Sequence, residues 1–136
     1  TFSFFKPFSY FEPSSSSLIF PINPTWFPNW DNPTIELSSF DKAVLKRCYD
    51  SGNKLVVVIL SGRPLIIEDH LGNWDGLIAA WLPGMAGEGV SDVLYGDYSP
   101  TATLSFSWPK NTNQLPLNEG DKVYDPLFPF GHGLSY

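Results

Sequence analysis

The sequence predicts an α/β fold, namely a partial three-layer α/β sandwich with a mostly parallel sheet, an irregular N-terminal leader and a loop-rich C-terminal tail. The unbroken apolar, β-branched run at 54–60 is typical of a strand buried on both faces, as in a parallel sheet covered by helices. A helical pattern precedes this run, and a second apolar run at 76–82 precedes a glycine-rich bend and another helical pattern. Strands alternating with helices in this way indicate right-handed crossovers in an open sheet.

The first helix is expected over residues 35–51. Apolar residues recur there at threes and fours, while Lys42, Lys46 and Arg47 occupy the polar side. Gly52, directly after this pattern, is the natural C-terminal stop.

The second half of the chain is expected to contain a strand at 76–82, a bend at 84–89 and a helix at 88–95. Apolar and polar residues alternate over residues 101–108, as in a strand. A proline on each side of the segment favours a position at the sheet edge. Beyond residue 110, proline and glycine predict an ordered tail without regular elements. Only about three strands are predicted, which indicates that the N-terminal half of the sheet is missing.

Composition changes abruptly near residue 31, so we divide the chain into a leader, 1–30, and a partial domain, 31–136. The leader holds seven Phe, six Ser and five Pro, and its only charged residues are Lys6 and Glu12. Its prolines interrupt every possible element, so we expect it to be mostly irregular. One hypothesis is that it is mis-predicted sequence, such as translated intron, because pyrimidine-rich codons encode Phe, Ser, Pro and Leu. A Phe/Pro-rich insertion with its own function is the competing hypothesis.

The net charge of −6 argues against binding to nucleic acid or to an anionic membrane surface, both of which attract basic proteins. No stretch of eighteen apolar residues predicts a membrane span. A single cysteine and two histidines give no metal-ligand spacing, so we expect no metal site.

Several residues can be assembled into candidate sites, each with a plainer structural explanation. The glycines of 84–89 could cradle a phosphate, but their order is not that of a dinucleotide fingerprint, and close strand–helix packing is favoured. Ser61 and His132 could join an aspartate in a hydrolase triad, but no nucleophile-elbow motif is present. The carboxylates that could serve glycoside hydrolysis, which needs a pair, are Asp69, Asp75, Glu88, Asp92, Asp97 and Asp125.

Arg63 follows the first strand, at the edge where open α/β sheets place their ligands. We favour a structural role for it, tying loop carbonyls or a carboxylate together. Trp74, Trp81 and Trp108 could stack on a sugar, although core packing is favoured for each. Residues 125–136 are expected to form a clasp in which His132 is a hydrogen-bonding member rather than a base.

An ordered set of motifs resembles one known family. These are KLVVVILSGRP at 54–64, AAWLPG at 79–84, GEG at 87–89, DVL at 92–94, GD at 96–97, LSFSWP at 104–109, QLP at 114–116 and YDPLFPFGHGLSY at 124–136. Together they resemble the C-terminal α/β domain of glycoside hydrolase family 3, β-glucosidases and β-D-glucan exohydrolases, over roughly residues 31–136.

The resemblance implies a retaining hydrolase that acts on terminal, non-reducing β-D-glucosyl residues without a cofactor. The family's nucleophilic aspartate belongs to a TIM-barrel domain, and its acid/base glutamate precedes a Gly-Asp pair in the α/β domain. Here Phe27 stands in the place of that glutamate and Trp30 in the place of that glycine, before Asp31. No catalytic, cofactor-binding or metal-binding residue is therefore assigned in these 136 residues.

The sequence thus predicts a domain fragment that is inactive alone and packs on the barrel. Its partners would be that missing barrel and, through the full enzyme, a β-glucoside or β-glucan oligosaccharide. For a plant-type parent enzyme the resemblance implies an extracellular or cell-wall location. A non-catalytic carbohydrate-binding or scaffold module is the alternative, followed by a nucleotide-binding α/β domain.

Overall fold

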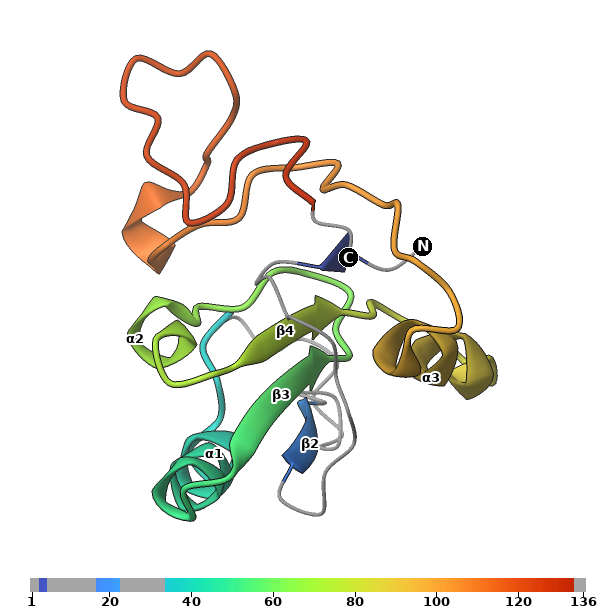
Figure 1. Cartoon of the computed structure of the whole chain (residues 1–136). Coiled ribbons are helices and arrows are strands. Elements are labelled where there is room, and N and C mark those ends of the chain that lie inside the picture. The colour runs from blue at the N-terminus through green and yellow to red at the C-terminus, as the bar shows by residue number, and fades with distance from the viewer. Residues whose placement is uncertain (1–2, 5–16, 23–33, 134–136) are drawn as a thin grey trace.

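A computed structural model of the chain describes residues 3–4, 17–22 and 34–133. Its sheet has the strand order β1-β4-β3-β2, with β1 at Ser3–Phe4, β2 at Ser17–Ile22, β3 at Lys54–Ile59 and β4 at Gly76–Ala79. Strands β2, β3 and β4 are parallel, and only β1 is antiparallel to its neighbour (Figure 1). The predicted α/β fold with a mostly parallel sheet is confirmed.

Both faces of the sheet are covered, which explains why β3 is apolar at every position after Lys54. Leu55, Val57 and Ile59 belong to one hydrophobic cluster, together with Leu45 of helix α1 (Ser39–Asp50). The alternate residues of β3 join a second cluster with residues of helix α3 (Gly87–Tyr95). Helices α1 and α3 accordingly lie on opposite sides of the sheet in Figure 1, which gives the three-layer arrangement.

Helix α1 begins later than predicted, at Ser39 rather than at residue 35. The Ser38 hydroxyl accepts a hydrogen bond from the Asp41 N–H at 3.0 Å and caps the helix there. Before this cap the chain is extended, and the Ile66 N–H donates to the Ile35 carbonyl at 2.9 Å. The helix ends close to the predicted position, where Gly52 adopts a positive φ of 72°.

Strand β4 is shorter than predicted, because Trp81 has a φ of 55°, which no strand residue adopts. Helix α3 is within one residue of its predicted start, and Gly96 ends it with a φ of 83°. A single-turn helix α2 at Glu68–Leu71 was not predicted.

The predicted edge strand at 101–108 is wrong. This segment bends at 105–106 and makes only isolated pairings, the one with a described partner being Trp108 with Phe128. Its partners come from the C-terminal tail, which itself follows a non-repetitive path and so offers no strand to pair with. The tail is loop-rich as predicted, with one 3-10 turn at Thr112–Gln114.

The expectation of an irregular leader fails at Ser17–Ile22. This segment pairs with β3 in parallel register from Ser17 opposite Lys54 to Ile22 opposite Ile59. Pro21 misled the prediction, since proline is tolerated where its missing donor is not required, as on a sheet's edge strand. The remainder of the leader lies outside the described residues, except for β1.

Candidate functional site at the carboxyl ends of the strands

The loops that follow β3 and β4 begin at the same edge of the sheet. The Leu60 N–H donates to the Ile22 carbonyl at 2.8 Å, and the Ala80 N–H donates to the Ile59 carbonyl at 2.9 Å. These bonds continue the parallel pairing to the ends of the strands. Ligands of open α/β sheets bind outside this edge, so the two loops form the first place to seek a site.

Trp81 fixes the path of the loop after β4 through its ring contacts and its backbone conformation. Its ring meets Phe106 edge-on, with centroids 5.3 Å apart, and lies 5.9 Å from the Trp108 ring. The positive φ turns the chain sharply here, and the following Leu82 and Met85 are largely exposed to solvent. The loop therefore presents two large apolar side chains beyond the carboxyl end of β4.

Arg63 has the structural role expected for it. Its guanidinium Nη2 donates to the Thr34 carbonyl at 3.1 Å, joining the loop after β3 to the segment before α1. Its backbone N–H donates to the Ser61 hydroxyl at 3.3 Å. Ser61 is itself buried, so these bonds fix the loop after β3 from two sides.

The C-terminal tail packs over the α1 side of the sheet through Trp108. The indole N–H of this fully buried residue donates to the Leu65 carbonyl at 2.8 Å, and its ring packs edge-on against Phe128. Phe128 in turn stacks on the His132 ring at 4.9 Å. The three predicted tryptophans are thus core or core-packed residues: Trp74 and Trp108 are buried, and Trp81 packs on the same cluster.

The predicted clasp is present as far as residue 133. The Leu104 N–H donates to the His132 carbonyl at 2.8 Å, and the Gly131 N–H donates back to the Leu104 carbonyl at 2.9 Å. His132 also donates through its backbone to the Pro129 carbonyl. It belongs to the clasp through its backbone and its stacked ring, whereas the Ser61 hydroxyl accepts from the Arg63 N–H of its own loop.

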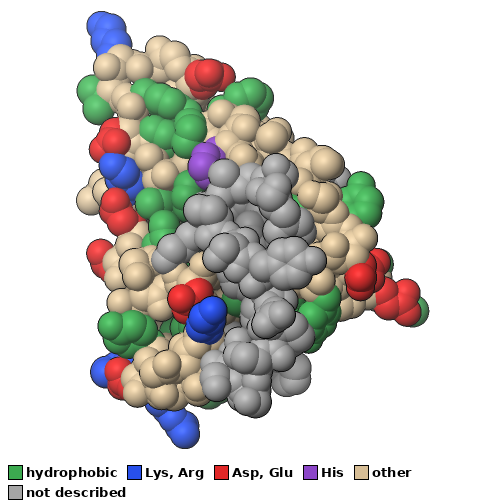
Figure 2. All heavy atoms as spheres, viewed as in Figure 1, with side chains coloured by type: hydrophobic (Ala, Val, Ile, Leu, Met, Phe, Trp, Pro, Cys, Tyr) green, Lys and Arg blue, Asp and Glu red, His purple; other side chains and the backbone are tan. Residues whose placement is uncertain are grey.

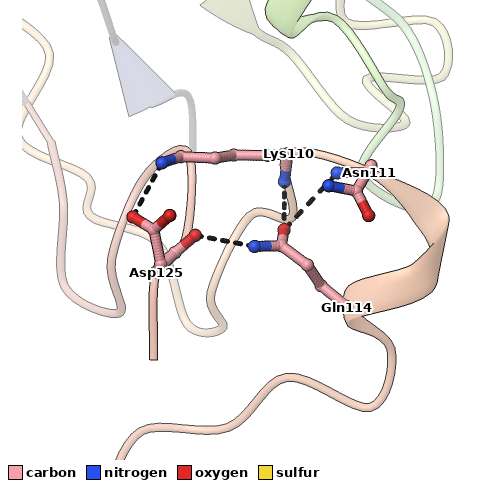
Figure 3. Close-up of polar contacts among 4 residues, drawn as sticks. All are labelled: Lys110, Asn111, Gln114 and Asp125. Atoms are coloured by element: carbon pink, nitrogen blue, oxygen red, sulfur yellow. Dashed lines mark hydrogen bonds and ion pairs between the residues drawn. The ribbon is translucent and has the colours of Figure 1, made fainter. Parts of the chain in front are cut away.

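A polar network closes the base of the tail loop (Figure 3). The Gln114 side chain accepts from the Lys110 N–H at 2.7 Å and donates to the Asp125 carbonyl at 2.8 Å. The Lys110 ammonium donates to the Asp125 carboxylate at 2.7 Å. This hydrogen bond and the negative charge of Asp125 raise the pKa of Lys110 above its ordinary value. Desolvation lowers the same pKa, but by less, so the net shift is upward.

The six candidate carboxylates come from several elements and loops, and only Glu88 and Asp92 share one, helix α3. Asp75 accepts from the Leu55 N–H at 2.8 Å and anchors the start of β3, and Asp125 holds Lys110. The other four are exposed; they are Asp69 on α2, Glu88 and Asp92 on α3, and Asp97 after α3. Within the described ranges, no group of three or more His, Cys, Asp or Glu could hold a metal ion.

The glycine-rich loop at 84–89 is largely exposed and leads into the N-terminus of α3. Glu88 lies in the first turn of that helix, where its negative charge complements the helix dipole and repels an anion. The loop therefore does not fit a phosphate.

The sequence did not single out Leu82 and Met85, although both stand beside Pro83-Gly84, a pair typical of an exposed turn. On the face shown in Figure 2, acidic side chains are interspersed with basic ones over the described surface, with no basic stripe of the kind that nucleic-acid binding uses. Among the described residues, no helix has the length and apolar character needed to cross a bilayer.

Comparisons with known proteins agree on one family. A family model described as the glycosyl hydrolase family 3 C-terminal domain matches residues 19–136. The match therefore starts inside β2 rather than at residue 31.

A xylan 1,4-beta-xylosidase of Xylanibacter ruminicola is 36% identical, with 91% of this chain and 15% of the relative covered. A periplasmic beta-glucosidase of Salmonella typhimurium is 34% identical, with 63% of this chain and 14% of the relative covered. The chain thus spans about one-seventh of the length of these relatives.

Solved structures show the same similarity. A crystal structure of an exo-1,3/1,4-beta-glucanase from a Pseudoalteromonas species has 38% identity and a TM-score of 0.74, covering 88% of this chain and 16% of that one. A beta-glucosidase from Listeria innocua, in complex with isofagomine, has 27% identity and a TM-score of 0.73, covering 88% and 20%. With its parallel sheet, its two helical layers and this match from residue 19 onward, the chain belongs to glycoside hydrolase family 3, within the family's C-terminal domain.

Proposed function

We propose that this chain is a C-terminal domain segment of a retaining β-glucosidase, and that alone it does not hydrolyse glycosides. The observation that carries the proposal is the family match over 19–136 in a chain that spans only 14–15% of two full-length relatives. The enzyme would release terminal β-D-glucosyl residues, with the remaining domains supplying what these residues lack.

The chemistry explains the expected inactivity. Retaining glycosidases need two carboxyl groups about 5–5.5 Å apart, one as nucleophile and one as acid/base. In this sequence Phe27 stands in the place of the family's acid/base glutamate, and the family's nucleophile belongs to the barrel domain. Loss of the general acid alone costs about 10²–10⁴-fold in rate.

The role that remains for these residues is to form a wall beside the catalytic domain. The loop after β4 suits this role, because Leu82 and Met85 are exposed apolar side chains at the edge where the site of an α/β sheet opens. Arg63 and Trp81 hold the two loops of this edge in place.

A β-xylosidase is the second candidate, because two of the similar proteins are named as xylosidases, at 36% and 32% identity. Xylosides lack the hydroxymethyl group of glucosides, so a pocket contact to that group decides between them.

The test is a turnover assay of the purified chain with 4-nitrophenyl β-D-glucoside and 4-nitrophenyl β-D-xyloside. We expect no release of nitrophenol above the uncatalysed rate with either substrate. Sustained turnover that copurifies with the chain would show that a catalytic pair is present, and would end the proposal of inactivity.

A further inference from the structure

A groove of 400 Å³ lies at the opposite edge of the sheet, near the amino ends of β3 and β4. One side is formed by residues of α1 between Lys42 and Asp50, and the other by residues 70–74, which lead from α2 into β4. Its volume falls within the range of about 300–1,000 Å³ that small-molecule sites occupy. No residue of the carboxyl-edge loops described above lines it.

The groove combines an apolar floor with an exposed aromatic wall. Leu45 and Trp74 are buried at its base, and the His70 ring is stacked parallel to Trp74 at 6.5 Å. Tyr49 lines the groove and is 51% exposed. A half-exposed phenol ring offers an apolar face and a polar tip to a ligand that is itself amphipathic.

Polar groups of both kinds line the same groove. The Lys46 ammonium and the Asp50 carboxylate are 2.6 Å apart, so a strong donor and a strong acceptor stand next to each other. Asn73, which is exposed, adds an amide with a carbonyl oxygen and two N–H donors. Neighbouring hydroxyl groups of a sugar, each both a donor and an acceptor, can form hydrogen bonds with these ammonium, carboxylate and amide groups.

The charges at the groove nearly cancel. Lys46 pairs with Asp50, and Lys42 pairs with Glu36 at 3.6 Å. Exposed ion pairs of this kind contribute little to stability, so a ligand can share these charges at little cost. The balance favours a neutral, hydroxyl-rich ligand over an anion.

We propose that this groove binds a neutral pyranose unit of an oligosaccharide. The C–H face of the sugar lies on Tyr49, and its hydroxyls bond Asp50, Lys46 and Asn73. This inference does not depend on the proposed hydrolase function, because it requires only residues within this chain.

A second cavity of 370 Å³ provides the comparison. It is lined by residues of α3 and the following loop, including Asp92 and Tyr98, and no lysine, arginine, asparagine or glutamine side chain lines it. Tyr98 is about as exposed as Tyr49. Tyr98→Ala is therefore a matched control for Tyr49→Ala.

The experiment is a titration of the ¹⁵N-labelled full chain with cellobiose, followed by amide chemical shifts, with glucuronic acid as a second probe. We expect saturable shifts confined to residues 42–50 and 70–74. Tyr49→Ala should weaken cellobiose binding roughly tenfold through the lost apolar contact, Asp50→Asn should also weaken it, and Tyr98→Ala should leave it unchanged.

Three results would overturn the proposal. They are the absence of saturable shifts at these amides in the unsubstituted chain, unchanged affinity in both the Tyr49→Ala and Asp50→Asn chains, and tighter binding of glucuronic acid than of cellobiose. Retained dispersion of the amide spectrum shows that each variant is folded, so loss of binding is not loss of structure.

Discussion

At the scale of single residues, the clasp depends on one glycine. A methyl group built on Gly133 would stand 2.5 Å from the Ala102 carbonyl oxygen and 3.1 Å from Thr103 Cα. Both are backbone atoms, which cannot rotate away as a side chain could. The close approach of two chain segments therefore requires glycine here.

We predict that Gly133→Ala lowers the free energy of unfolding by about 1–3 kcal/mol, the usual cost of overpacking. Urea denaturation followed by tryptophan fluorescence measures it. Gly72→Ala is the control, because Gly72 has an ordinary helical φ of −60° and no atom within 4 Å of the added methyl. Equal stability of the two variants would mean that residues 102 and 133 are not in contact.

The Lys110–Asp125 pair gives a prediction about pH. Asp125 raises the pKa of Lys110 above the ordinary 10.5, first through its hydrogen bond and then through its charge. A pKa that is higher in the folded state contributes stability at pH values below the unfolded pKa, and this contribution is lost as pH rises through the folded pKa. The pair should therefore stabilise the tail at neutral pH and cease to do so in strong alkali, above pH 10.5.

An NMR titration of the Lys110 side chain tests this directly. Asp125→Asn should lower the pKa of Lys110, whereas Glu119→Gln, an exposed carboxylate in the same tail, should leave it in place. A Lys110 pKa that is the same in all three proteins would contradict the network in Figure 3.

At the scale of elements, helix α1 is defined by its N-cap. Ser38 accepts from the Asp41 N–H and its hydroxyl donates to the Asp41 carboxylate at 2.6 Å. These two reciprocal hydrogen bonds give the Asp41 N–H a partner, which the first turn of a helix does not supply from within the helix.

Ser38→Ala should therefore destabilise the protein by about 1 kcal/mol, within the usual range for loss of a serine cap. Thermal unfolding followed by circular dichroism is a suitable measurement. Ser39→Ala, at the adjacent first helical position, should change the melting temperature little. The reverse order of effects would place the start of the helix elsewhere.

Elements with a strong local pattern were predictable, whereas elements fixed by distant partners were not. Strand β3 was predicted to within one residue, because five consecutive buried apolar residues admit few other structures. The segment 101–108 has the alternation of a strand, yet its hydrogen-bond partners lie in the tail near Phe128 and His132. The start of α1 was misplaced because Ile35 and Leu37 fit a helical period as well as the extended path they follow.

The leader contains a strand that amino-acid composition alone does not predict. The prolines of the leader argued against a strand at Ser17–Ile22, but the segment pairs along its whole length with β3. Its hydrogen bonds come from a partner more than thirty residues away, which local patterns do not contain. The hypothesis that the leader is mis-predicted sequence stays a prediction, and a transcript read across the junction of Trp30 and Asp31 tests it.

The candidate site was only partly predictable. The position of Arg63 after a buried strand indicated a structural tie, and its bond to the Thr34 carbonyl confirms that role. The positive φ of Trp81 and the exposure of Leu82 have no signal in the sequence beyond the adjacent proline and glycine. The Trp81 ring packs on Phe106 and Trp108, which are distant from it in the sequence.

At the scale of the whole molecule, one sheet with both faces buried explains the arrangement. Helices α1 and α3 cover opposite faces, the tail extends the α1 side through Trp108, and the loops after β3 and β4 remain at one edge (Figure 1). This arrangement leaves an edge with exposed Leu82 and Met85, on which we expect the catalytic domain to pack.

The most direct test of this account is a chimera. Residues 34–133 would replace the matching segment of the Pseudoalteromonas exo-1,3/1,4-beta-glucanase, which shares 38% identity with this chain. We predict a folded chimera that hydrolyses β-glucan within about 100-fold of the parent rate, the cost that a displacement of about 1 Å at the site can bring. A folded chimera with no more turnover than the same enzyme lacking the segment would contradict the proposal that these residues serve as a working C-terminal domain.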